Sequence, residues 1–231
     1  MSAPSPVTVP RVSVVVPVLN DARALESLLP RMAGSPRLEI IVADGGSVDR
    51  SAAVTRAHGC RLVSSRPGRG YQLAEGCAGA RAPWIWMLHA DSVPSPEAFN
   101  HLLGLSPEHP GWGRFSVSLA PGAPLEIVAC SMNLRSRLTG ICTGDQGIFV
   151  HRELLDAVGG VPRQSLMEDI ELSRRLKARQ RPSCRGERIA SSPRRWRAQG
   201  TLRTVLSMWL FRLRYWLGTD AERLAREYYR S

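Results

Sequence analysis

Three polar side chains, Asn20, Asp44 and Asp91, each come at the end of a continuous apolar run. If these runs are parallel strands, their carboxyl ends share one edge of a sheet, and the three side chains converge there. Asp91 could hold Mg²⁺ or Mn²⁺ shared with the phosphates of a ligand, because such cations favour one or two carboxylates plus phosphate oxygens. The structural alternative is that Asp91 caps the helix expected from Pro96 or closes a turn.

Two glycine-containing loops could bind the rest of a phosphorylated ligand. In the segment 44–49 the glycines allow close backbone approach, and Asp44 can accept hydrogen bonds from a base or ribose. Gly68, Arg69 and Gly70 enter a helix, so they offer backbone N–H groups and a guanidinium to a diphosphate. A plain glycine-rich turn is the alternative, and a P-loop is excluded because no Gly-Lys-Ser/Thr follows.

The second half of the chain offers a general base and further polar contacts. Glu168 and Asp169 open a helix, where the helix dipole alone could explain them, but Asp169 could also face a cleft as a base. Glu168 would then point elsewhere. Arg195 could bind a phosphate while the Trp196 ring stacks on a ligand. Alternatively, Arg195 is a surface charge and Trp196 a core tryptophan. Residues 144–147 (Gly-Asp-Gln-Gly) could line an acceptor pocket or form an ordinary turn.

The elements that would position these residues alternate along the first half of the chain. Apolar strands alternating with helices are typical of a parallel sheet covered on both faces. We expect strands over 12–16, 38–43, 61–64 and 84–88, and helices over 22–32, 51–57 and 71–80. The second half is less regular, with strands expected over 113–119 and 147–150 and helices over 125–138, 168–179 and 202–217. No linker divides the chain, so we expect a frayed segment 1–10 and one domain over 11–231.

The length, cysteine content and charge of the chain limit the classes of protein to which it could belong. The 231 residues suffice for one substantial core. The five cysteines are odd in number and lack C-x-x-C spacing, which favours reduced thiols in a cytoplasm over a disulfide framework. Neither a signal peptide nor a run of about 18 apolar residues is present. Of the net charge of +11, residues 163–231 carry +10, which favours anionic ligands or surfaces, or else a solvated basic face.

Four motifs in order resemble the family 2 glycosyltransferases over about residues 12–196. They are Val-Val-Val-Pro-Val-Leu-Asn-Asp (14–21), Ala-Asp-Gly-Gly-Ser-Val-Asp (43–49), His-Ala-Asp (89–91) and Glu-Asp (168–169). Within that family the chain is most similar to a small bacterial branch named as radical-SAM and selenodomain-associated. Gly-Arg-Gly (68–70), Gly-Asp-Gln-Gly (144–147) and Met-Glu-Asp-Ile-Glu-Leu-Ser (167–173) carry that finer similarity.

The resemblance implies an α/β GT-A fold, with a Rossmann-like, mostly parallel nucleotide-binding sheet flanked by helices and a C-terminal acceptor-binding helical region. Residues 11–110 would form the nucleotide-sugar half and 111–231 the acceptor half. Asp169 would be the catalytic base and Asp91 the metal ligand for Mn²⁺ or Mg²⁺. The nucleotide-sugar, with UDP favoured, would contact Pro17, Val18, Asn20, Asp44, Gly68, Arg69, Gly70, Ala90 and Asp91. The acceptor or phosphates would meet Gly144, Asp145, Gln146, Glu168, Arg195 and Trp196.

Three positions depart from the family pattern. His89 stands where many relatives carry a first aspartate, so metal coordination could rest on Asp91 alone. Ala74 replaces a frequent asparagine. Ser192 replaces the glutamine that precedes Arg-Trp in processive synthases, so we expect a non-processive, inverting transferase acting on a hydroxyl acceptor, either a small molecule or a lipid.

Two other classes compete with this interpretation. A nucleic-acid-binding module would use the basic last third and bind with steep salt dependence and without a metal. A sugar nucleotidyltransferase usually shows a glycine-rich loop after its first strand, where this chain has Pro-Val-Leu-Asn (17–20). The apolar stripe of segment 202–217 fits an anionic membrane, a second copy of the chain in a homodimer, or the domain's own core. We therefore expect a cytoplasmic protein that binds no nucleic acid, with peripheral contact at the inner membrane face as a further alternative.

Overall fold

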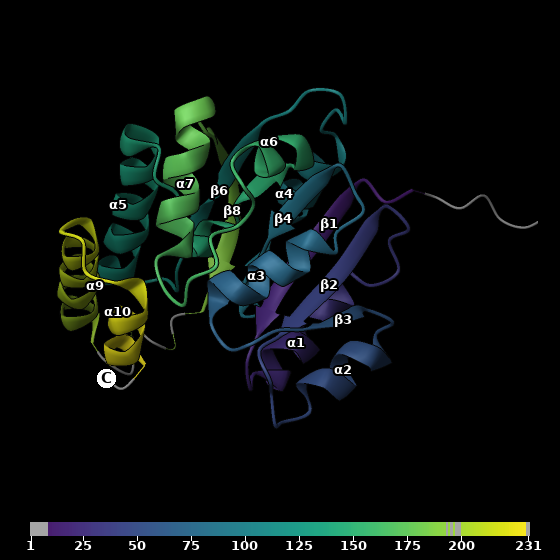
Figure 1. The fold of residues 1–231 in the computed structure, drawn as a ribbon, viewed down its shortest axis with the longest axis horizontal. Helices are drawn as coiled ribbons and strands as arrows, with labels where there is room; N and C mark the ends of the chain where they lie inside the picture. The colour runs from purple at the N-terminus through teal and green to yellow at the C-terminus, as the bar shows by residue number, and fades with distance from the viewer. Residues whose placement is uncertain (1–8, 193, 195, 197–199, 230–231) are drawn as a thin grey trace, which may run out of the picture.

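An eight-stranded mixed sheet forms the centre of the structure, a computed structural model that describes residues 9–192, 194, 196 and 200–229. The strands lie in the order β3-β2-β1-β4-β7-β6-β8-β5, with helices on both faces (Figure 1). The strands are β1 Val12–Val18, β2 Leu38–Asp44, β3 Arg61–Ser64, β4 Trp84–Met87, β5 Ser92–Pro94, β6 Trp112–Ser118, β7 Phe149–His151 and β8 Ser183–Ser191.

The helices follow the sequence expectations closely in the first half and add elements in the second. They are α1 Ala22–Leu28, α2 Ser51–Ala57, α3 Arg69–Ala78, α4 Pro96–Leu103, α5 Ala123–Thr139, α6 Arg152–Ala157, α7 Glu168–Arg179, α9 Thr201–Trp216 and α10 Ala221–Tyr228, with short 3-10 turns at Leu29–Arg31 and Gly144–Gln146. Of these, α6 and α10 were not anticipated. The segment expected to fray, 1–10, lies largely outside the described residues.

The first half of the chain forms the parallel part of the sheet. Strands β3, β2, β1 and β4 run parallel, so their carboxyl ends meet at one edge. Every residue of β1 is buried, because helices cover both of its faces. One core cluster packs α1 and α4 on the sheet through residues such as Leu25 and Leu102, and the other packs α3 and α7 through Leu73 and Leu172. The α/β GT-A architecture expected from the resemblance is confirmed.

The second half extends the sheet with strands of both directions. β7 runs antiparallel to β4 and to β6, whereas β8 runs parallel to β6 and antiparallel to β5. Strand β8 therefore lies between two strands that precede it in the chain by many residues. This arrangement brings the end of β8, and the segment that follows it, to the edge where the first half ends its strands.

The two C-terminal helices lie at the outer side of the molecule beside α5 (Figure 1). Glu222 of α10 accepts hydrogen bonds from the Tyr71 hydroxyl at 2.6 Å and the Ser165 hydroxyl at 2.7 Å, which ties α10 to α3 and to the loop before α7. Helix α9 buries Thr204 and Phe211. Most of its apolar stripe is exposed, so the alternative in which this stripe packs on the domain's own core is wrong.

Candidate active site

A cavity of about 320 Å³ lies at the carboxyl ends of β1 and β4, between the two halves of the chain. The first half contributes Pro17, Val18, Leu19, Asp21, Arg69, His89, Ala90 and Asp91 to its walls. The second half contributes Thr143, Asp145, Asp169, Ser191, Ser192, Trp196, Thr204, Met208, Arg212 and Tyr228. The aspartates that the sequence singled out as metal ligand and base, Asp91 and Asp169, therefore face the same space.

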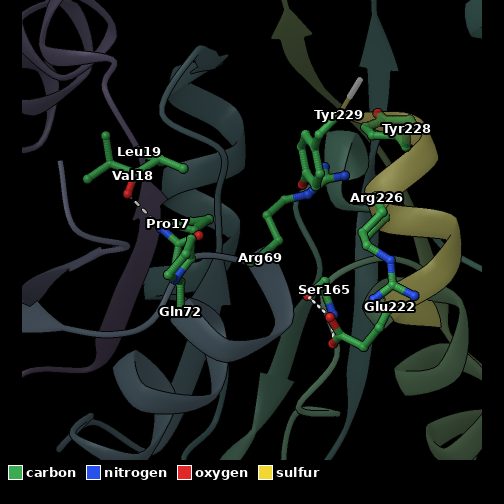
Figure 2. A pocket seen from close by; sticks show the side chains of 13 residues that line it. Pro17, Val18, Leu19, Arg69, Gln72, Ser165, Glu222, Arg226, Tyr228 and Tyr229 are labelled. Atoms are coloured by element: carbon green, nitrogen blue, oxygen red, sulfur yellow. Dashed lines mark hydrogen bonds between the residues drawn. The ribbon is translucent and has the colours of Figure 1, made fainter. Parts of the chain in front are cut away.

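A larger cavity of about 1000 Å³ adjoins the first and shares Pro17, Val18, Arg69 and Tyr228 with it. Figure 2 shows Arg69 between Gln72 on one side and the side chains of α10 on the other. The Gln72 amide donates to the backbone oxygens of Val18 at 2.6 Å and Ala43 at 3.0 Å, so it joins the ends of β1 and β2 beneath this cavity. The two cavities together form a cleft with room for an extended ligand.

Asn20 and Asp44 hold two loops together after the ends of β1 and β2, and neither residue is among those that line the two cavities. The side-chain oxygen of Asn20 accepts a hydrogen bond from the Val48 backbone amide at 2.8 Å, and the backbone N–H of Asn20 donates to the Ser47 hydroxyl at 2.9 Å. Its left-handed backbone, with φ of 53°, suits asparagine better than most residues. One oxygen of Asp44 accepts two hydrogen bonds from Ser47. Its second oxygen accepts none from the described residues and is available to a ligand.

The segment 68–70 is built for close packing at the start of α3. Gly68 has φ of 122°, a conformation that favours glycine. Arg69 lines both cavities and forms an ion pair with Glu168 at 3.3 Å. Gly70 is buried where the loop before α7 crosses α3. The loop thus combines a guanidinium facing the cleft with a backbone that a side chain would disturb.

We expect Gly70→Ala to destabilise the protein by about 1–3 kcal/mol, because overpacking forces the backbone to shift. The added methyl group would lie 2.3 Å from the backbone oxygen of Gln164 and 2.5 Å from that of Pro162. Thermal unfolding measures the effect. The control is Gly186→Ala, where the added carbon meets nothing within 4 Å and the change should be small. Equal melting temperatures for the two variants would contradict the packing argument.

Asp91 fits a metal ligand by its surroundings. Its side chain is 33% exposed and lines the cavity, and its one charged neighbour among the described residues is Arg194, with the nearest oxygen and nitrogen 3.8 Å apart. No three acidic, histidine or cysteine side chains gather into a metal cluster within the part of the chain that the structure describes. A cation here would therefore depend on Asp91, water and ligand phosphates, which is a common arrangement for Mg²⁺.

Asp169 is held in the cavity by two backbone hydrogen bonds. One carboxylate oxygen accepts from the Gly144 amide at 3.0 Å and the other from the Ile170 amide at 2.8 Å. Glu168 does not line this cavity, is 2% exposed and pairs with Arg69. Burial raises the pKa of Glu168, with a further rise from Asp169 and an opposing effect from Arg69. The two adjacent acids thus occupy different environments, and only Asp169 lines the cavity.

His89 and Asp145 form a polar pair on the wall beside Asp169. The His89 Nδ1 lies 3.3 Å from an Asp145 carboxylate oxygen, and the Arg69 guanidinium lies 3.4 Å from His89 Nε2. Burial favours the neutral acid, but the hydrogen bond from His89 and the nearby charges of His89 and Arg69 outweigh it and lower the pKa of Asp145 to about 2. Asp145 is therefore an anion at neutral pH.

The other residues expected to contact the acceptor have different surroundings, and not all of them line the cavity. Gly144 packs against the His89 ring, where an added carbon would lie 2.4 Å from Nε2. Gln146 is fully buried and donates to Asn133 and Ser136, so its contacts are structural. Trp196 lines the cavity and also packs in the core cluster with Val128 and Met132. Arg195 lies outside the described residues.

Two further arginines, one lining the cavity and one beside it, lie near the acidic side chains of the site. Arg212, on α9, lines the cavity, and burial lowers its pKa while Asp169 and Asp145 oppose that shift. Arg194 forms an ion pair with Asp21 at 2.9 Å and faces Asp91. The sequence marks Arg194 through its place beside Arg195 and Trp196, and Arg212 through its place in the apolar segment 202–217.

Comparisons with known proteins agree with this geometry. Residues 13–110 match the model of Glycosyl transferase family 2, and no curated protein matches the chain. Glucosyl-3-phosphoglycerate synthase from Mycobacterium tuberculosis, solved with Mn²⁺, uridine-diphosphate and glucosyl-3-phosphoglycerate, is 21% identical with a TM-score of 0.56; 79% of this chain and 70% of that one are covered. A mannosyltransferase from Pyrobaculum calidifontis, solved with GDP-Man and Mn²⁺, is 22% identical with a TM-score of 0.61. The match covers 82% of this chain and 59% of the mannosyltransferase.

At these identities the structural likeness shows the fold alone, and the sequence match to the family model covers 98 of the 231 residues. That match spans β1 to the end of α4 and includes Asp44, the loop around Arg69, and Asp91. The residues that line the cleft from the first half thus lie within the matched segment. Residues 13–110 thus carry the similarity to Glycosyl transferase family 2, and the chain has the GT-A fold.

Proposed function

We propose that this chain is an inverting, metal-dependent, non-processive glycosyltransferase that moves a sugar from a nucleotide-sugar to a hydroxyl acceptor. The observation that carries the proposal is the position of Asp91 and Asp169, which come from opposite halves of the chain and line one cavity. UDP is the nucleotide favoured by the family resemblance. The same resemblance supports a place in the bacterial branch associated with radical-SAM and selenodomain genes, and the division into a nucleotide-sugar half (11–110) and an acceptor half (111–231).

The donor would lie along the edge of the parallel strands. The free oxygen of Asp44 would accept from the base or ribose, and Arg69 would face the diphosphate. Asp91 would hold Mn²⁺ or Mg²⁺, which supplies positive charge to the leaving diphosphate. The solved relatives contain Mn²⁺ with UDP or GDP-Man, and one structure of the mycobacterial synthase contains Mg²⁺ with UDP.

The chemistry left to the protein is a proton transfer and charge stabilisation. Asp169 would accept the proton of the acceptor hydroxyl while the hydroxyl oxygen forms a bond to the anomeric carbon. The bond from that carbon to the diphosphate breaks, and the electron pair leaves with the diphosphate beside Arg69. A single displacement of this kind inverts the anomeric centre. Trp196 and Arg212, at the other side of the cavity, would contact the acceptor.

The proposed location is the cytoplasm, where thiols stay reduced. All five cysteines are free thiols. None of the helices formed by the described residues has the length and apolar character that crossing a bilayer requires.

The proposal is tested by isothermal titration of UDP, GDP and TDP into the protein, with Mn²⁺ or with EDTA. We expect one nucleotide to bind tightly with the metal and weakly with EDTA. If no nucleotide binds with the metal present, while DNA or RNA binds with a steep salt dependence, the chain is a nucleic-acid-binding protein instead.

A further inference from the structure

Helix α9 exposes an unusual amount of apolar surface. Seven of its large hydrophobic side chains, counting Leu217 at its C-terminal cap, are between 52% and 81% exposed: Leu202, Leu206, Trp209, Leu210, Leu213, Trp216 and Leu217. Their spacing of three and four residues places them along one side of the helix. The opposite side, with Thr204 and Phe211, is buried against the domain.

Helix α5, a neighbour of α9, also exposes large apolar side chains. Ile127, Leu134 and Leu138 are 68%, 58% and 69% exposed and share one side of α5 by their spacing. The two helices contact each other, because Val205 and Met208 of α9 pack in the cluster that contains α5 residues. Figure 1 shows α9 and α5 next to each other at the outer side of the molecule. We call the ten exposed apolar residues of α9 and α5 the outer face.

A surface of this kind needs a partner. Soluble monomers rarely expose contiguous apolar patches of more than a few hundred Å², and larger ones mark protein or membrane contacts. The outer face has no counterpart among the other exposed large hydrophobics of the described residues, which are single side chains such as Leu19, Val48 and Tyr229. Isolated residues of that sort are normal on a protein surface.

The charge of the chain and the residue types of α9 favour a lipid surface over a second copy of the chain. Helix α9 contains no acidic residue, and of its three arginines Arg203 is exposed, whereas Arg212 faces the cavity and Arg214 pairs with Glu227. The whole chain carries +11, so two copies would repel each other, whereas an anionic lipid surface would attract the chain. Trp209 and Trp216 are 68% and 81% exposed, and tryptophan favours the boundary between lipid and water. Leucine, tryptophan and arginine on one amphipathic helix are typical of helices that lie in the membrane interface.

We propose that the outer face docks on an anionic membrane surface, with α9 lying in the plane of the interface. The inference rests on the exposure and charge of α9 and α5, and it holds whichever reaction the cleft performs. The buried side of α9 carries Thr204, Met208 and Arg212, which line the cavity. Docking would therefore hold the cavity about one helix diameter, roughly 10 Å, from the lipid. An acceptor hydroxyl on a lipid would be within reach of that cavity.

The test is co-sedimentation with vesicles of phosphatidylglycerol and phosphatidylcholine, compared with vesicles of phosphatidylcholine alone. We expect binding to the anionic vesicles that weakens at high salt, and a blue shift of tryptophan emission as Trp209 and Trp216 leave water. The variant Leu206→Gln/Leu210→Gln/Leu213→Gln keeps both tryptophans and changes only exposed side chains. It should lower the partition coefficient at least about tenfold.

The matched control is Val48→Gln, which replaces a 92% exposed apolar residue in the loop between β2 and α2. We expect it to sediment with vesicles as the wild type does. Arg203→Gln should weaken binding severalfold and flatten its salt dependence. Metal-dependent nucleotide binding, measured on the triple variant, should be unchanged, so a failure of docking is distinguished from a failure of the proposed transferase function.

Two results would overturn the proposal. The first is the absence of binding to anionic vesicles at low salt, or equal binding to neutral ones. The second is a dimer by sedimentation equilibrium that the triple variant dissociates, without any affinity for vesicles. That outcome would assign the outer face to a second copy of the chain.

Discussion

Asp169→Asn is expected to lower the rate of sugar transfer by about 10²–10⁴-fold, the usual effect of removing a positioned general base. Asparagine keeps the shape of the side chain and one acceptor oxygen for the backbone amides of Gly144 and Ile170, so the cavity should keep its geometry. Nucleotide binding should stay near the wild-type value, because Asp169 lies on the acceptor side. The measurement is release of nucleoside diphosphate in a single turnover, beside titration of the nucleotide.

The control for this variant is Glu171→Gln on the same helix. Glu171 pairs with Arg174 and Arg175 rather than lining the catalytic cavity. Removing its charge should leave the transfer rate nearly unchanged. A rate in Asp169→Asn that equals the rate in Glu171→Gln would exclude Asp169 as the base.

Asp91→Ala is expected to lower nucleotide affinity in the presence of Mn²⁺ by about a hundredfold, or roughly 3 kcal/mol. Since the described residues offer no cluster of metal ligands at the cavity, the loss of this one carboxylate should remove the protein's hold on the ion. With EDTA the variant and the wild type should bind nucleotide equally weakly. Isothermal titration under both conditions measures the difference.

Asp21→Asn separates metal coordination from general electrostatics. Asp21 also lines the cavity and forms an ion pair with the same Arg194 that faces Asp91. If Asp91 acts as a ligand, the Asp21 variant should keep most of its metal-dependent affinity. A similar loss in both variants would show that negative charge near Arg194 matters rather than coordination by Asp91.

The structure of the first half could be predicted from the sequence because its signals are local. Helix α2 and strand β3 have the expected bounds, and the parallel sheet follows from the alternation of apolar runs and helices. Once the strands are parallel, the convergence of Asn20, Asp44 and Asp91 at one edge is a geometric consequence. The start of α7, and with it the position of Asp169, was also correct.

The helices and strands of the second half were harder to predict from the sequence because they bury few apolar residues. Strand β8 buries only Ile189 and Ser191, so it lacks the continuous apolar pattern of β1. Helix α10 is short, and its buried residues are Ala221, Leu224 and Ala225, too few for a clear periodic signal. The hydrogen bond from the Arg223 amide to the Asp220 side chain is a helix cap that could have revealed it.

Several site residues reach the cleft through tertiary contacts that the sequence did not reveal. Arg212 faces the cavity because α9 packs across α5, and no spacing in the sequence encodes that packing. Glu222 contacts Tyr71, 151 residues away in the chain. Gln72 does have a local position, in the first turns of α3, but its role depends on the backbone oxygens of two other strands.

The order of strands in the sheet also limits how the chain can be divided. The segment that matches the family model ends at residue 110, between β5 and β6. A fragment ending there would leave the edge of β4, Trp-Ile-Trp-Met, without β7, and would leave β5 without its partner β8. Unpaired apolar edges of this kind promote aggregation. During synthesis on the ribosome the nascent chain therefore carries an unprotected edge until residue 151 has emerged. For the same reason, residues 11–110 are not a separable module for domain exchange.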